Sequence, residues 1–244
     1  MVSLLWLFTL IYWIAISALD GKIAGDFMST AANRKASEEY SRIREAYGAQ
    51  AWLYGTTTTK EFTAFRKPVL EPLCEGVPDG DYVAQSGWAL YYVSVDTQGE
   101  IAWDSGVYKR AGRPDAHVIE ILTEQTPPEY RAYLRKQGVS YIHAGKDTLD
   151  CKRAAQKLKT LLGIEKMLIC GGGTVNWSFL SSGVVDELSL LLSPVADGDP
   201  NTPTVFERME QLGQSRPVLF HLQKVSQWPN DVVHLTYTTE NQED

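Results

Sequence analysis

The chain has 244 residues, of which 44% are hydrophobic, and this is enough for one substantial folded core. Its net charge of −7, without a basic stripe, argues against nucleic acid as a main partner. The three cysteines lack CxxC spacing and the four histidines lie far apart, so we expect reduced thiols and no metal site.

The first 19 residues carry no charge, and by length and hydropathy they qualify as a membrane segment. No Lys or Arg precedes them, however, so the positive region of a signal peptide is missing. A central strand that is buried on both faces is also continuously apolar. We therefore predict a buried strand over 11–19 and a hydrophobic extension of unassigned role over 1–10. A membrane-anchored protein is the alternative.

Helical and strand patterns alternate through the middle of the chain. A helix is expected after Ser29 or Thr30, either of which can cap it, and it should close at Gly48. A second helix should start at Pro127-Pro128. The remaining expected elements are strands over 51–54, 90–95, 117–123 and 139–144, an amphipathic helix over 148–162, and loops over 66–81 and 104–116.

The stretch 167–194 is the most informative part of the chain. It predicts a strand over 167–170, three glycines, a helix over 174–182 and a second strand over 187–193. Three glycines allow the backbone to approach a ligand closely, and the amino end of a helix attracts phosphate. Thr174 is the expected cap of that helix and Gly183 its end. The pattern predicts a nucleotide phosphate site; an ordinary glycine-rich turn is the alternative.

The C-terminal part predicts a loop and then a hairpin. An Asx-rich turn is expected over 197–201, because the ligand spacing of a calcium loop is absent. Two long strands flank Trp228-Pro229-Asn230, which is a hairpin signal. Strands that alternate with helices and end in an antiparallel hairpin predict an α/β fold with one mixed sheet flanked by helices. We expect a single domain over 11–240.

The 167–194 string resembles the reductase domain of the riboflavin-pathway deaminase–reductase family, the RibD C-terminal domain. That family carries strand–GGG–x–x–N, then a Leu, then Gly–Val/Leu–Val–Asp–Glu–Leu, then a Pro. The matching residues here are Gly171, Gly172, Gly173, Asn176, Leu180, 183–188 and Pro194. The string Leu19-Asp20-Gly21-Lys22-Ile23 also resembles the end of the family's first strand. The resemblance implies a dihydrofolate-reductase-like fold with a mostly parallel sheet.

The resemblance further implies an NADPH-dependent oxidoreductase of riboflavin biosynthesis. Its nominal substrate is 5-amino-6-(5-phosphoribosylamino)uracil, and hydride passes to a polar heterocyclic or sugar-derived C=N or C=O group. Catalytic roles are implied for Asp20, Lys22 and Glu187, whereas Asp186 is expected at the surface or in a cap. Cofactor binding is implied for Gly55, Thr56, Thr57, Thr58, Ser94, Gly171, Gly172, Gly173, Thr174, Val175 and Asn176. The family also implies a small-molecule substrate, a homodimer and a cytoplasmic location.

The chain departs from the family at two places. Thr56 stands where related chains often carry Arg, so the 2′-phosphate of NADPH must be recognised elsewhere. Lys109, Arg110 and Arg113 are candidates, and an ordinary solvated loop is the alternative for this cluster. The substrate-seating Asp-Asn-Pro segment is replaced by Thr-Thr-Lys-Glu-Phe-Thr over 58–63. Two alternatives therefore stay open: a dihydrofolate-like, pterin-like or other small-molecule reductase of the same fold, and a nucleotide-binding protein without turnover.

Overall fold

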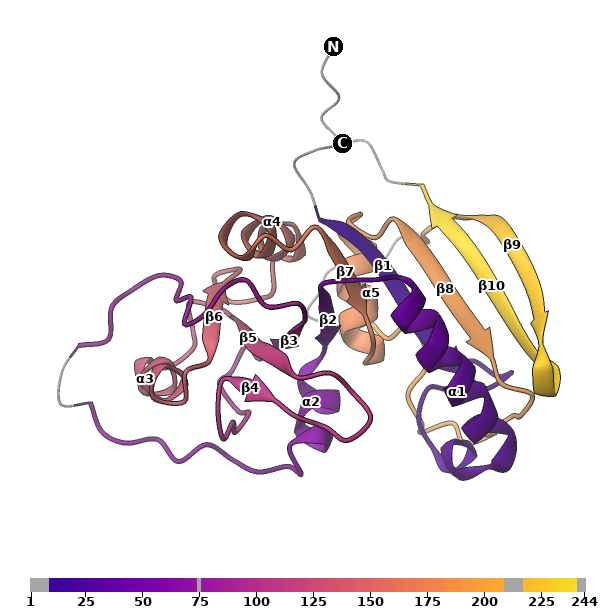
Figure 1. Ribbon diagram of the computed structural model, residues 1–244, viewed down its shortest axis with the longest axis horizontal. Helices are drawn as coiled ribbons and strands as arrows, with labels where there is room; N and C mark the ends of the chain where they lie inside the picture. Colours follow the sequence, from indigo (N-terminus) through magenta and orange to yellow (C-terminus); the bar gives the residue numbers. More distant parts are fainter. Residues whose placement is uncertain (1–8, 74–75, 209–216, 241–244) are drawn as a thin grey trace, which may run out of the picture. The chain divides into compact units, whose positions relative to one another are not determined.

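The structure is a computed structural model that describes residues 9–73, 76–208 and 217–240. These residues group into two compact units. The first unit contains Thr9 and Gln50–Met167; the second contains Leu10–Ala49 and the described residues from Leu168 onwards. Figure 1 traces the elements of both units. The predicted 11–240 domain and the 1–10 extension stay predictions, and most of that extension lies outside the described residues.

The first unit is an α/β unit with a mixed, mostly parallel set of strands. Its elements are β2 (Ala51–Tyr54), α2 (Thr56–Phe62), β3 (Tyr91–Val95), β4 (Val107–Tyr108), β5 (Ala116–Leu122), α3 (Pro128–Lys136), β6 (Ser140–His143) and α4 (Cys151–Leu162). The strand order is β4-β5-β3-β2, and β6 also pairs with β5. Strands β2, β3, β5 and β6 pair in parallel, whereas β4 is antiparallel to β5.

Every residue of β2, β3 and β5 is buried, as expected for parallel strands that are covered on both faces. Because the strands are parallel, the segments that follow β2, β3, β5 and β6 all leave from the same edge of the sheet. Ligands of open α/β sheets bind at this carboxyl edge. The Gly55–Thr58 turn, which follows β2, is therefore at the edge where a cofactor is expected.

The second unit combines parallel and antiparallel pairing. Its elements are β1 (Leu10–Ser17), the 3-10 helix η2 (Asp26–Ser29), α1 (Ala31–Ala46), α5 (Gly173–Ser181), β8 (Glu187–Leu192), β9 (Phe220–Trp228), the 3-10 helix η4 (Pro229–Asp231) and β10 (Val232–Thr239). Strand β7 (Lys166–Ile169) is divided between the two units. β1 and β8 are parallel, and β10 is antiparallel to both β8 and β9.

The apolar N-terminal segment is a strand over Leu10–Ser17, which confirms the predicted strand over most of its length. Ile11, Trp13 and Ile14 are almost fully buried, and the register pairs Trp13 with Leu188 of β8. Helix α1 packs on β1 and β8 and runs alongside them in Figure 1. Within the residues that the structure describes, no helix is long and apolar enough to cross a membrane.

The predicted fold class is confirmed: the sheet is mixed and mostly parallel, helices flank it, and the C-terminal hairpin is antiparallel. Two element boundaries differ from the sequence prediction. Helix α4 begins three residues later than expected, because the Asp150 side chain accepts a hydrogen bond from the Arg153 N–H and caps the helix there. Strand β4 lies inside the predicted 104–116 loop, because its two residues are too few to show the apolar–polar alternation of a strand.

Candidate functional site

The glycine turn of the second unit joins β7 to α5. Gly171 has φ +134° and Gly172 has φ +73°, conformations that residues with a Cβ rarely adopt. Gly172 occupies the N-cap position of α5, and no side chain caps the helix. The prediction that Thr174 is the cap is therefore wrong: the helix begins one residue earlier, and Thr174 lies in its first turn. The predicted end at Gly183 is confirmed by its φ of +71°.

Glycine is required at the third position, Gly173, for a steric reason. A Cβ on Gly173 would lie 2.4 Å from the carbonyl oxygen of Thr204 and 2.8 Å from Cγ of Glu207. The absence of a side chain at Gly173 is thus required by the chain segment around Thr204. Beside Gly171, in contrast, an added Cβ would meet no atom within 4 Å. Open space of this kind at a turn before a helix is where a ligand phosphate can approach the backbone.

Asn176 is a buried residue of α5 that ties the helix to the segment around Val205. Its side chain is only 1% exposed, and Nδ2 donates a hydrogen bond to the carbonyl of Val205 at 2.8 Å. Val175 is also buried. Of the predicted cofactor residues on α5, Thr174 therefore has the accessible side chain, and the others can offer a ligand only backbone N–H groups.

The turn after β1 is bound to the loop that follows β8. The exposed Asp20 carboxylate accepts hydrogen bonds from the N–H groups of Gly198 (2.8 Å) and Asp197 (3.1 Å), and these hold the pKa of Asp20 below its usual value. The ammonium group of Lys22 donates to the carbonyl of Thr202 at 2.7 Å, and the residue is 9% exposed. Asp20 therefore orders a loop, whereas Lys22 is a nearly buried cation.

Glu187 lies at the opposite end of the same strand pair. Its register partner is Tyr12, near the amino end of β1, and its carboxylate accepts a hydrogen bond from the Tyr47 hydroxyl. Burial, followed by this contact with Glu187, raises the pKa of Tyr47. From Tyr12 the strand runs a further five residues, about 16 Å at the usual rise, to Ser17, and Asp20 lies beyond it. The structure thus does not bring Glu187 to the predicted site beside Asp20.

Asp186, which we expected at the surface or in a cap, is half-buried and binds the start of β1. Its Oδ2 accepts a hydrogen bond from the backbone N–H of Ile11 at 2.7 Å, and its own N–H donates to the carbonyl of the same residue at 2.8 Å. These two contacts fix the start of β1 against the start of β8.

In the first unit, the predicted Gly55–Thr58 turn opens helix α2, as the sequence indicates. Gly55 is the N-cap, and the Thr56 hydroxyl donates to the carbonyl of Val95, at the end of β3, at 2.6 Å. Thr57 is exposed and Thr58 is half-buried, so both can contact a ligand. The turn and the end of the neighbouring strand are therefore held together at one edge.

Ser94 is less suited to its predicted role. It is fully buried on β3 opposite Glu120 of β5, so neither its side chain nor its backbone is accessible to a cofactor. Glu120 is also fully buried and accepts a hydrogen bond from the Trp103 indole N–H. Burial, and to a lesser degree Asp96, raises the pKa of Glu120 well above its ordinary value. The sequence did not predict this buried acid, because apart from His117 its strand is apolar and no pattern marks Glu120 as functional.

Asp96 directly follows β3 and is a second organising residue that the sequence did not predict. Its carboxylate accepts hydrogen bonds from the N–H groups of Gly99, Glu100 and Ile101 and from the Tyr130 hydroxyl. Burial raises its pKa in spite of these donors. The Asp-x-x-Gly spacing was the available sequence signal.

The three cations proposed for the 2′-phosphate border α2. The Arg110 guanidinium lies 4.5 Å from the centre of the Phe62 ring, and Arg113 donates to the Tyr54 hydroxyl at 3.1 Å. Lys109 forms a 3.4 Å ion pair with Asp115.

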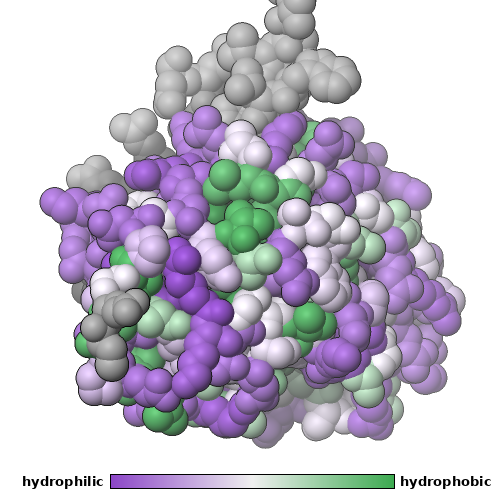
Figure 2. All heavy atoms as spheres, turned by 60° about the vertical axis from the view of Figure 1, so that its left-hand side comes forward, coloured by the Kyte–Doolittle hydropathy of each residue, from purple (hydrophilic) through white to green (hydrophobic). Residues whose placement is uncertain are grey.

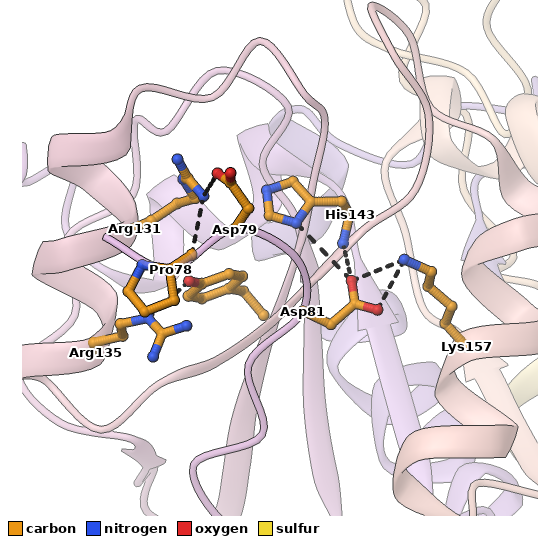
Figure 3. A network of polar contacts seen from close by, with 8 residues as sticks. Pro78, Asp79, Asp81, Arg131, Arg135, His143 and Lys157 are labelled. Atoms are coloured by element: carbon orange, nitrogen blue, oxygen red, sulfur yellow. Dashed lines mark hydrogen bonds and ion pairs between the residues drawn. The ribbon is translucent and has the colours of Figure 1, made fainter. Parts of the chain in front are cut away.

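A polar cluster at the edge of the first unit fixes the chain next to β6 (Figure 3). Asp81 accepts hydrogen bonds from the backbone N–H of His143 and from Lys157 of α4, both at 2.8 Å, and Arg131 of α3 pairs with Asp79 at 3.2 Å. Burial, aided by Arg131, lowers the pKa of His143. The charged groups bind one another across several elements, and the arrangement is structural.

A hollow of about 610 Å³ lies between the segment 66–73 and α3 of the first unit. Four of its charged side chains form two ion pairs: Arg66 with Asp104 at 2.5 Å, and Lys136 with Glu71 at 2.9 Å. None of the predicted site residues lines it. The face of the molecule shown in Figure 2 is mainly hydrophilic, with small separate apolar patches.

Comparison with known proteins gives a family match. The model of the RibD C-terminal domain matches residues 91–234, which include the glycine turn. The 2,5-diamino-6-ribosylamino-4(3H)-pyrimidinone 5′-phosphate reductase of Aquifex aeolicus is 32% identical over 91 residues, 37% of this chain and 40% of the relative. The enzyme of the same name from Methanothermobacter thermautotrophicus is 33% identical over 93 residues, 38% of this chain and 42% of the relative. The match thus spans about two fifths of each curated relative.

The fold is also that of a solved structure. A pyrimidine reductase-like protein from Corynebacterium diphtheriae superposes with a TM-score of 0.68 at 19% identity. The superposition covers 96% of this chain and 93% of the other. At this identity the likeness is one of fold.

Proposed function

The chain belongs to the RibD C-terminal domain family, and on that basis we propose that it is an NADPH-dependent reductase of a ribosylamino-pyrimidine 5′-phosphate. Both curated relatives are named as reductases of such a compound. Their named substrate and 5-amino-6-(5-phosphoribosylamino)uracil differ in whether the pyrimidine ring carries a second amino group. The proposal covers both.

The observation that carries the proposal is the glycine turn before α5. Two glycines with positive φ, open space beside Gly171, and a helix without a side-chain cap form a fitting place for a cofactor phosphate. In the proposal, the backbone N–H groups of the first turn and the Thr174 hydroxyl bind that phosphate. Gly55, Thr56, Thr57 and Thr58 are the proposed cofactor residues of the first unit.

The bound cofactor supplies the hydride, and the protein supplies orientation and a proton route. We assign Lys22 to the substrate, because it is a nearly buried cation at the carboxyl end of β1. A substrate with a phosphate and a polar ring offers such a cation an anionic or acceptor partner. Asp20 keeps the turn in place through Gly198 and Asp197. Glu187 serves the packing of α1 instead.

One observation favours a second candidate, a reductase of another C=N or C=O compound such as a pterin. The segment that replaces the family's Asp-Asn-Pro run belongs mostly to helix α2, which ends at Phe62. A helix at this place offers a substrate different groups from those of an extended Asp-Asn-Pro segment.

The direct test is NADPH oxidation by the purified full-length protein, followed by absorbance. The substrates are the two ribosylamino-pyrimidine phosphates and dihydrofolate. We expect oxidation with at least one ribosylamino compound. Oxidation with dihydrofolate alone would replace the proposal by the second candidate. NADPH binding without oxidation of any compound would identify a nucleotide-binding protein without turnover.

A homodimer in the cytoplasm is also part of the proposal. Light scattering coupled to size-exclusion chromatography measures the first, with an expected mass of twice 27.3 kDa. Cell fractionation measures the second. A monomer, or recovery in the membrane fraction, would contradict the corresponding part.

A further inference from the structure

The segment 202–207 of the second unit contacts two of the predicted site regions, and we call it the strap. On one side it binds the turn after β1. The N–H of Ile23 donates to the carbonyl of Pro203, and the N–H of Val205 donates to the carbonyl of Gly21, both at 3.0 Å. The Lys22 ammonium donates to the carbonyl of Thr202. The proposed substrate cation is therefore held by the strap.

On its other side the strap binds the glycine turn and α5. The N–H of Glu207 donates to the carbonyl of Gly173 at 3.0 Å, and Asn176 donates to the carbonyl of Val205 at 2.8 Å. The strap packs so closely that a Cβ on Gly173 would overlap the Thr204 carbonyl. Any displacement of the glycine turn must therefore be shared by the strap.

The strap is held by a hydrogen bond within it and by an aromatic contact with β1. The Glu207 carboxylate accepts a hydrogen bond from the N–H of Thr204 at 2.8 Å. The Phe206 ring lies 5.0 Å from the ring of Trp13 on β1, measured between centres. These contacts make the strap one bound piece of chain that cannot bend independently at each end.

Val205 is the residue at which both sides meet. Its N–H binds the turn that carries Lys22, and its carbonyl accepts the hydrogen bond of Asn176. Val205 is thus hydrogen-bonded both to a side chain of α5 and to the turn that carries Lys22.

We propose that Asn176 and Glu207 are positioning residues, which act through Val205 to hold the Lys22 turn in register with the glycine turn. The inference rests on the proposed function for the assignment of a cofactor to the glycine turn. The link itself is a property of the protein without ligands, and can be tested separately.

The first test is amide hydrogen exchange in the full-length protein. In Asn176→Leu, which keeps the side-chain size but removes the donor, exchange at the Ile23 amide should become at least about tenfold faster. Ile23 does not contact Asn176, so a purely local role would leave its exchange unchanged. The matched control is Ser178→Ala on the same helix, whose hydroxyl donates to the Thr174 carbonyl and not to the strap. Wild-type exchange at Ile23 in folded Asn176→Leu would overturn the proposal.

A second pair of variants keeps the test decisive if Asn176→Leu does not fold. Glu207→Ala removes the acceptor for the Thr204 N–H, whereas Glu207→Gln retains an acceptor oxygen. We expect faster exchange at Ile23 in the first variant and near-wild-type exchange in the second. Equal exchange at Ile23 in both variants would overturn the link.

The final test adds NADPH to the wild-type protein. Binding should slow exchange at the Ile23 and Val205 amides by about tenfold, because a ligand on the glycine turn restrains the strap. If NADPH binds and these amides do not change, the positioning role is wrong. If NADPH does not bind, the proposed cofactor fails, and the positioning role fails with it. In that case the exchange measurements on the variants still decide whether the link exists.

Discussion

The hydroxyl of Tyr47 donates a hydrogen bond to the carboxylate of Glu187, at the end of the β1–β8 pair that is farther from Lys22. The two residues are 140 positions apart in the chain, and they join the end of α1 to the first residue of β8. In this contact the acid binds the helix that packs on the sheet, and the catalytic role that the family resemblance implies for Glu187 stays a prediction. This contact gives the first prediction.

Tyr47→Phe should lower the free energy of unfolding by about 1–2 kcal/mol, because a half-buried carboxylate loses its donor. NADPH affinity should change less than about twofold, since neither residue lies near the glycine turn. Urea unfolding and a fluorescence titration measure the two quantities. Glu187→Gln, which keeps an acceptor, is the milder control. A large loss of turnover with unchanged stability would return Glu187 to the mechanism.

Lys22→Met should lower the rate of hydride transfer by about 10²-fold or more, if the ammonium manages a proton or orients the substrate. NADPH affinity should stay near that of the wild type. Single-turnover oxidation of NADPH measures the rate. Lys35→Met, at an exposed position of α1, controls for the loss of charge. Full activity in Lys22→Met would remove this residue from the mechanism.

Thr174→Val should weaken NADPH binding about tenfold, or 1.4 kcal/mol, by removing the accessible hydroxyl in the first turn of α5. Ser178→Ala, one turn further along, should bind NADPH as the wild type does. A bulky residue at Gly172 is a poorer probe, because its φ of +73° would strain the backbone with or without a ligand. Unchanged affinity in Thr174→Val would exclude this hydroxyl from the phosphate site.

Arg110→Gln should reduce NADPH affinity about tenfold and leave NADH affinity unchanged, if this cation recognises the 2′-phosphate. Lys35→Gln is the matched control, because it removes one positive charge at an exposed position of α1 that is not a candidate for the 2′-phosphate. Titration with both nucleotides gives the ratio. If the wild-type protein binds NADPH and NADH equally, there is no 2′-phosphate site to assign.

Glu120→Gln should stabilise the protein, increasingly so as the pH rises. The folded pKa of Glu120 lies above its ordinary value of 4.5, so the acid is most favourable below about pH 4.5. Between that pH and the raised pKa, the wild-type protein loses up to about 1.4 kcal/mol per pH unit, which the amide avoids. Urea unfolding at pH 5 and pH 8 measures the difference, and Glu124→Gln, exposed after β5, is the control. A pH-independent difference would show that Glu120 is ionised in the folded protein.

The sequence predicted local elements well where one residue type decides them. The Thr30 hydroxyl caps α1, Pro128 opens α3 and Gly183 follows α5, as expected. The Asx turns at 197–201 are also present. The backbone N–H of Asp199 donates to the Asp197 carboxylate, and the backbone N–H of Asn201 donates to the Asp199 carboxylate. The cap of α5 was predicted two residues late, at Thr174, because Gly172 serves as N-cap without a side chain and hydroxyl residues are the usual signal.

Contacts between distant segments could not be predicted from the sequence. The position of Glu187 depends on the register of β8 against β1, and apolar strands carry little register information. The same holds for Asn176, whose partner Val205 is 29 residues away in a segment without regular structure. The buried acid Glu120 breaks the apolar pattern of its strand, so only the partner Trp103 explains it.

The pairing of β1 with β8 also affects how the chain is made. Ile11 and Asp186, which fix the start of this pair, are 175 residues apart. During synthesis the apolar first strand emerges early, while its partner is added only after more than two thirds of the chain. Until then the side of β1 that pairs with β8 has no native hydrogen-bond partner, and loop closure over such a separation is slow. We therefore expect nascent chains that stop before β8 to aggregate or bind chaperones. Chains that include β8 can pair it with β1 and complete this part of the sheet.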